Sequence, residues 1–152
     1  KNANEDLIFF IEDDYLHFET MLEEMIASYE RIASQINNDI FMCPSDYPYL
    51  YMNNSKTNIL IGNKRHWRTV DKTLCTFMTT KSLLNKYWDN FYKNCLERHD
   101  PFEKYLNEIY SKEICISPLK SLSLHLTNIN SSYGLSPLID YKKLWEENKI
   151  ND

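Results

Sequence analysis

Three consecutive acids, Glu12, Asp13 and Asp14, are the residues of this chain best suited to chemistry. They follow the apolar run 7–11, which is typical of a strand buried on both faces, as in parallel sheets. Carboxylates there repel one another and lose hydration, so a hard cation or a cationic partner must offset them. Because ligands bind at this end of the strands in open α/β sheets, the motif predicts a divalent-metal site facing a crevice. Asp14 is the natural direct ligand, whereas Glu12 or Asp13 would act through water or on a sugar hydroxyl; a solvated turn is the alternative.

Two residues far along the chain add further candidates. Asp100 precedes Pro101, so its carboxylate either caps a helix or acts as a general base on an acceptor hydroxyl. His125 lies between two leucines of an alternating segment. It is either a hydrogen-bonded structural residue or a neutral imidazole ligand beside Asp14.

A cationic and aromatic cluster occupies residues 65–68. The guanidinium of Arg68 could bind a phosphate and the indole of Trp67 could stack on a sugar ring. An exposed turn with extended arginine side chains explains the cluster equally well. The tyrosine-rich segment 47–51 offers similar aromatic surfaces, and protein–protein packing is its alternative explanation.

The order of these motifs resembles the glycosyltransferases of the GT-A fold. The stretch FFIEDDYLHF is similar to their acidic strand, and RHWRTVDKTLCTFMTTKSLL to their acceptor-side strand entering a helix. RHDPFEKYL and SLSLHL stand where members of the family place a catalytic acid and a further metal-binding histidine. The resemblance implies an α/β fold with a GT-A-like mixed sheet flanked by helices.

The resemblance also implies an activity and roles for single residues. The protein would move a sugar from a nucleoside-diphosphate sugar to a hydroxyl of a glycan or other acceptor, with Mn²⁺ or Mg²⁺ offsetting the charge of the diphosphate. Asp14 and His125 would hold the metal, and Asp100 would be the base of an inverting reaction; the retaining alternative stays open. The substrate-binding residues would be Glu12, Asp13, Trp67 and Arg68.

One feature departs from the family pattern. The nucleotide-binding half of a GT-A domain precedes the acidic motif, whereas here eleven residues precede it. We therefore expect residues 1–152 to be a single domain, the metal- and acceptor-side C-terminal portion of a catalytic domain that is incomplete at its N-terminus. The other half would lie upstream of Lys1.

Hydrophobic periodicity predicts the elements that position these residues. Helices are expected at residues 18–32, 83–95, 102–110 and 141–148, the second capped by Thr79 or Thr80. Strands are expected at residues 7–11, 39–43, 58–62, 67–78, 113–116 and 121–126, with a long surface loop at 44–57.

Composition narrows the choice of function. A net charge of −5 argues against a non-specific nucleic-acid surface, and no apolar stretch is long enough to span a bilayer. Without a signal peptide, a location in the cytoplasm or on the cytoplasmic face of a membrane is expected. Two other functions remain open: a metal-dependent phosphoesterase or nuclease, and an aromatic-rich binding domain without catalysis.

Overall fold

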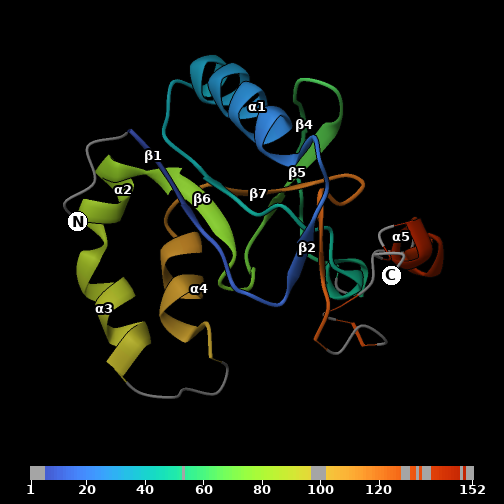
Figure 1. The fold of residues 1–152 in the computed structure, drawn as a ribbon. Coiled ribbons are helices and arrows are strands. Elements are labelled where there is room, and N and C mark those ends of the chain that lie inside the picture. The colour runs from blue at the N-terminus through green and yellow to red at the C-terminus, as the bar shows by residue number, and fades with distance from the viewer. Residues whose placement is uncertain are drawn as a thin grey trace.

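A computed structural model describes residues 6–52, 54–96, 102–127, 131, 132, 134, 138–147 and 149. Within these residues six strands form one mixed sheet (Figure 1). In spatial order they are β1 (Leu7–Phe10), β6 (Phe77–Thr80), β3 (Phe41–Met42), β7 (Cys115–Pro118), β5 (His66–Val70) and β4 (Ile59–Ile61). Strands β3 and β7 are parallel, whereas the other neighbours in the sheet are antiparallel. The mixed α/β class expected from the sequence is confirmed.

Helices cover both faces of this sheet (Figure 1). Helix α1 (Met21–Ile36) packs on one face, where it meets alternate strand residues such as Met42, Met78 and Ile116. The other face carries α2 (Lys81–Lys86), α3 (Trp88–Leu96) and α4 (Lys104–Tyr110). Neighbouring strand residues such as Phe41 and Phe77 point to this second side. Because successive side chains of a strand point to opposite faces, short apolar strands supply both cores.

Strand β1 differs from its expected setting. It lies at the edge of the sheet, and its partner β6 is antiparallel, with Leu7 opposite Thr80 and Phe10 opposite Phe77. The expectation of a strand in a parallel pair was therefore wrong. The unbroken apolar run arises because Leu7 and Phe9 pack on one core and Ile8 and Phe10 on the other. An unbroken apolar run therefore indicates that both faces of the strand are covered, but it does not show whether the neighbouring strand is parallel or antiparallel.

A separate two-stranded ribbon pairs a segment near the N-terminus with a segment more than 100 residues later in the chain. Strand β2 (Tyr15–His17) pairs antiparallel with β8 (Ser123–His125), and Tyr15 stands opposite His125. Backbone hydrogen bonds extend the ribbon at both ends, from Leu126 N to Asp14 O at 2.8 Å and from Phe18 N to Leu122 O at 3.0 Å. This pairing fixes the acidic turn against the segment that carries His125.

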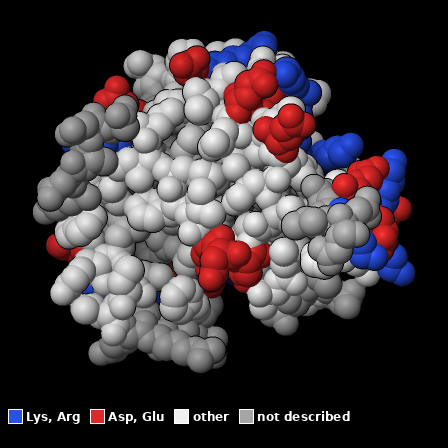
Figure 2. Space-filling model, in the orientation of Figure 1, with Lys and Arg blue, Asp and Glu red and all other residues white. Residues whose placement is uncertain are grey.

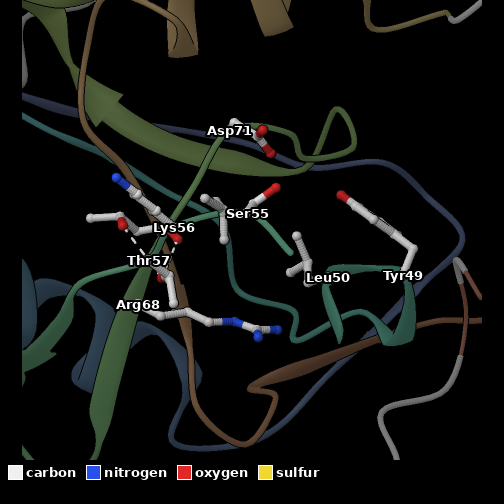
Figure 3. Close-up of a pocket in the computed structure, with 9 residues that line it drawn as sticks. Tyr49, Leu50, Ser55, Lys56, Thr57, Arg68 and Asp71 are labelled. Carbon is white, nitrogen blue, oxygen red and sulfur yellow. Dashed lines mark hydrogen bonds between the residues drawn. The ribbon is translucent and has the colours of Figure 1, made fainter. Parts of the chain in front are cut away.

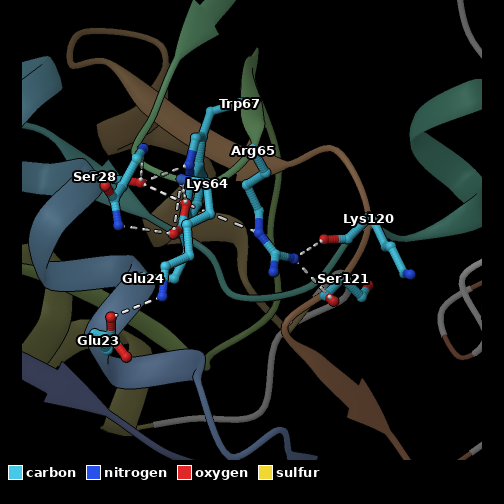
Figure 4. Close-up of polar contacts among 9 residues, drawn as sticks. Glu23, Glu24, Ser28, Lys64, Arg65, Trp67, Lys120 and Ser121 are labelled. Atoms are coloured by element: carbon cyan, nitrogen blue, oxygen red, sulfur yellow. Dashed lines mark hydrogen bonds and ion pairs between the residues drawn. The ribbon is translucent and has the colours of Figure 1, made fainter.

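A polar cluster anchors α1 to the hairpin of β4 and β5 (Figure 4). Ser28 Oγ donates to Glu24 at 2.9 Å and accepts the indole N–H of Trp67 at 3.0 Å. Glu24 also accepts the backbone N–H of Lys64 in the hairpin turn. Since Glu24, Ser28 and Trp67 are all buried, these hydrogen bonds satisfy polar groups that water cannot reach.

The observed helices lie where the sequence predicts helices, but several differ from the prediction in length. Thr80 caps α2 as expected, because its Oγ1 accepts the backbone N–H of Leu83 at 3.1 Å. The helix expected at 83–95 is instead two helices that meet at Tyr87. A short 3-10 helix, η1 (Pro48–Tyr51), lies within the expected loop, and α5 (Tyr141–Glu147) matches the expected C-terminal helix. No helix among the described residues is both long enough and apolar enough to cross a membrane.

Candidate metal and substrate site

The candidate site lies at one edge of the sheet. Strands β1, β3 and β7 run in the same direction, because β1 and β3 are both antiparallel to β6 and β7 is parallel to β3. The segments that follow these three strands therefore meet at their carboxyl ends. Leu122 N donates to Pro44 O at 2.8 Å, and the hydroxyls of Tyr15 and Tyr47 lie 2.5 Å apart. This is the edge at which open α/β sheets bind ligands.

Asp14 and His125 meet at this edge. They are 111 residues apart in the chain, yet Nε2 of His125 lies 2.9 Å from Oδ2 of Asp14. The side chain of Asp14 is about a third exposed, at 32%, and that of His125 is 12% exposed. The structure thus brings together the two residues that the sequence assigned to a metal, and one of them faces solvent.

The surroundings keep the Asp14 carboxylate ionised. Burial raises the pKa of this group, but hydrogen bonding to Thr127 and the nearby His125 outweigh it, so the pKa lies below its ordinary value. Charge on Asp14 is therefore favoured in the folded protein. An ionised carboxylate is the form that binds a divalent cation.

Aromatic stacking orients His125. The ring of Tyr15 stacks on its imidazole, with ring centroids 4.9 Å apart. Tyr15 is held in turn by its hydroxyl contact to the buried Tyr47. The stack directs the imidazole edge toward Asp14, as a ligand or a hydrogen-bond donor requires.

Two further glutamates act on the same edge. Burial raises the pKa of Glu12, and the charges of Asp14 and Glu103 raise it further. Burial likewise raises the pKa of Glu103, which precedes α4, while the charge of His125 opposes that rise. Figure 2 shows acidic side chains gathered over the turn between β1 and β2, beside a hollow in the surface. The edge is therefore anionic, and it carries the partly buried carboxyl groups of Glu12 and Glu103 in addition to Asp14.

The other residues assigned from the sequence are placed differently. Asp13 is exposed in the turn between β1 and β2. Asp100 lies outside the described residues. The structure places Trp67 in the core, with an exposed fraction of 0%. An enclosed indole has no face for a sugar, so the structure does not place this residue in a substrate site.

Arg68 is also buried, but on the opposite face of β5. Its Nη2 donates to Asp46 Oδ1 at 2.5 Å, and its guanidinium lies 4.0 Å from the ring centre of Tyr51. Asp46 neutralises its charge within the protein. Arg68 is therefore not a free cation that could bind a diphosphate beside Asp14. It lines a pocket on its own face of the sheet instead.

Sequence reasoning missed three residues of this site. Tyr15 follows the acidic motif directly, and its place on an alternating strand was an available signal. Glu103 stands three residues after Asp100, within the motif that drew attention to Asp100. Thr127 carried no signal, since only the pairing of β2 with β8 brings it to Asp14.

Comparison with protein-family models, with curated proteins and with solved structures finds no match to this chain. The function is therefore inferred from the site.

Proposed function

We propose that this protein is a metal-dependent glycosyltransferase of the GT-A type. It would transfer a sugar from a nucleoside-diphosphate sugar to an acceptor hydroxyl. The observation that supports the proposal is the contact between Asp14 and His125, two residues 111 positions apart that lie 2.9 Å from each other at the carboxyl ends of the strands.

The donor atoms at this contact fit a metal that is shared with a substrate. A carboxylate oxygen and an imidazole nitrogen are both ligands of Mn²⁺, and Mg²⁺ accepts the carboxylate with water and substrate phosphates completing its shell. Among the described residues, no group of three or more His, Cys, Asp or Glu side chains is arranged to hold an ion. An ion held by Asp14 and His125 would thus take its other ligands from diphosphate oxygens and water. When bound, it would offset the negative charge of the departing diphosphate.

The chain's own residues have separate tasks in this proposal. Asp14 supplies a carboxylate whose lowered pKa keeps it ionised. Tyr15 holds the imidazole of His125 in place by stacking. Glu12 and Asp13 remain candidates for sugar hydroxyls, and Asp100 for the base that takes the acceptor proton. Half-buried Glu12 suits a hydroxyl, because its carboxyl oxygens can accept a hydrogen bond from one.

Thermal unfolding with and without Mn²⁺ tests the proposal. A ligand present at about 100 times its Kd stabilises the folded state by about 2.7 kcal/mol, which corresponds to a rise in Tm of roughly 5–10 °C. We expect such a rise for the native sequence, and a further rise on adding UDP or GDP. Asp14→Asn and His125→Ala should each abolish most of it.

Asp89→Asn is the matched control, because Asp89 is an exposed residue of α3. It should leave the rise intact. A rise in Tm that survives Asp14→Asn would show that Mn²⁺ binds elsewhere and would contradict the proposal. Transfer of sugar from a panel of nucleotide sugars, lost in Asp14→Asn at unchanged fold, would establish the activity.

A further inference from the structure

A second site lies away from Asp14, on the face of the sheet that also carries α2, α3 and α4. It is a pocket of about 170 Å³ between η1, residues 55–57 and the end of β5 (Figure 3). Its polar lining includes Lys56, Arg68 and Asp71, and its apolar lining includes Leu50 and Val70. None of the roles proposed above for the metal site uses this space.

The walls of the pocket are fixed by hydrogen bonds. Thr57 Oγ1 donates to Thr69 O at 2.7 Å, and Asn58 N donates to Thr69 Oγ1 at 2.9 Å. On another side, Asp46 and the ring of Tyr51 hold the guanidinium of Arg68. The pocket is therefore formed before a ligand arrives, which lowers the entropic cost of binding.

Several polar groups of the lining are unused. Lys56 and Asp71 are exposed, and neither makes a side-chain hydrogen bond or an ion pair with another described residue. Nε of Arg68 is buried and has no hydrogen-bond partner within the described part of the chain. Lys56 therefore offers donors and Asp71 acceptors to a ligand, whereas Nε of Arg68 is closed to solvent.

The balance of charge decides which ligand fits. Asp46 offsets the charge of Arg68, and Asp71 opposes that of Lys56. A phosphate or carboxylate ligand would meet no net positive charge here. Hydroxyl groups both donate and accept, so a neutral ring with several hydroxyls offers donors for Asp71 and acceptors for Lys56, and its C–H groups are suited to the apolar side chains of Leu50 and Val70. Drug-sized ligands occupy pockets of about 300–1,000 Å³, so this smaller pocket suits a single ring.

We propose that this pocket binds one pyranose ring of a neutral carbohydrate. Tyrosine contacts link the pocket to the edge that holds Asp14. Tyr49 lines the pocket and stacks on Tyr47, with ring centroids 5.4 Å apart, and the hydroxyl of Tyr47 lies 2.5 Å from that of Tyr15, the residue after Asp14. The identification of this ring as part of the acceptor rests on the proposed function, whereas carbohydrate binding itself does not.

Amide chemical shifts followed by NMR during a titration test the pocket. The probes are methyl pyranosides of glucose, galactose, mannose and N-acetylglucosamine, without metal or nucleotide, and inorganic phosphate is the comparison. We expect saturable shifts at Leu50, Thr69 and Val70 for at least one pyranoside. Asp71→Asn and Lys56→Ala should each weaken binding about tenfold, as expected for a lost hydrogen bond to a charged group.

Matched variants separate the pocket from general surface effects. Asp89→Asn and Lys112→Ala alter exposed residues outside the lining and should leave the affinity unchanged. The proposal is overturned if no pyranoside shifts these amides, if Asp71→Asn and Lys56→Ala bind as the native sequence does, or if phosphate binds more tightly than every pyranoside. Pyranoside binding that persists while Mn²⁺ leaves the Tm unchanged would refute the transferase and support the carbohydrate pocket.

Discussion

The carboxylate of Glu24 accepts the backbone N–H of Lys64, with each of its oxygens 3.0 Å from the nitrogen. Glu24 belongs to α1 and is 1% exposed, whereas Lys64 belongs to the turn between β4 and β5. The neighbouring Glu23 instead makes an exposed ion pair with Lys64 Nζ at 2.9 Å (Figure 4). One lysine therefore meets two successive glutamates, one through its backbone and one through its side chain.

Glu24→Gln should destabilise the protein far more than Glu23→Gln. Glu24→Gln replaces one of the two acceptor oxygens by an NH2 group. This group would either face the backbone N–H of Lys64, donor against donor, or remain buried without an acceptor, and either arrangement costs about 1–3 kcal/mol of stability. Glu23→Gln removes an exposed ion pair worth about 0–1 kcal/mol. Urea denaturation of both variants measures the difference. Equal losses would show that Glu24 contributes no more than a surface charge.

Arg68→Met should cost about 3–5 kcal/mol of unfolding free energy, because it leaves the buried carboxylate of Asp46 without a cation. Asp46→Asn in the same chain should restore part of that loss, since the remaining side chain is neutral. Lys143→Met is the control, as it breaks an exposed ion pair with Glu147. A double variant as unstable as the sum of the single variants would contradict a coupled pair.

Gly62→Ala should lower the Tm by roughly 2–12 °C, as an overpacked core costs about 1–3 kcal/mol. A Cβ on Gly62 would lie 2.6 Å from Ser28 Oγ and would overlap the indole of Trp67. Lys64→Ala, in the same turn but exposed, is the control. In the Trp67→Phe background Gly62→Ala should lower the Tm by less, because the smaller ring leaves room for the methyl group. An unchanged loss of Tm would show that the overlap with Trp67 is not the cause.

Glu12→Gln should stabilise the protein at neutral pH. Burial, with the charge of Asp14, raises the pKa of Glu12 above its ordinary value of 4.5, so the folded state disfavours the charged carboxylate. This cost develops as the pH rises through 4.5 and the higher folded-state pKa, and it is absent below both values.

The gain in Tm of Glu12→Gln should therefore be present at pH 7 and vanish below about pH 4, measured in buffer containing a chelator. Glu19→Gln, at an exposed position, should show no such dependence. A gain in Tm that is the same at pH 7 and below about pH 4 would mean that the charge of Glu12 does not destabilise the folded protein.

Local patterns in the sequence predicted elements well and partners poorly. The strands expected at 58–62 and from residue 67 do form the hairpin of β4 and β5, because alternation and a turn specify a local pairing. The run 67–78, however, contains two strands, β5 and β6, that are not neighbours in the sheet. Alternation of apolar and polar residues shows which face of a strand is buried, but it does not show which strand is its neighbour in the sheet.

The same limit applies to the functional residues. Asp14 and His125 were identified by residue type and resemblance, and the structure brings them together. Trp67 and Arg68 looked like a surface cluster because charged neighbours surround them. Their partners, Ser28 and Asp46, lie 39 and 22 residues away, so only the folded chain reveals that both side chains are buried and satisfied.

The pairing of β2 with β8 also has a consequence for the order of folding. Its contacts span more than 100 residues, as in the 106 residues that separate His17 from Ser123. Closing a loop of that length is slow compared with forming the hairpin of β4 and β5 or the helices. During synthesis, Asp14 is made long before His125. The contact between them can form only after nearly all of the described chain has been made. We therefore expect the edge that carries Asp14 and His125 to be among the last parts of the molecule to assemble.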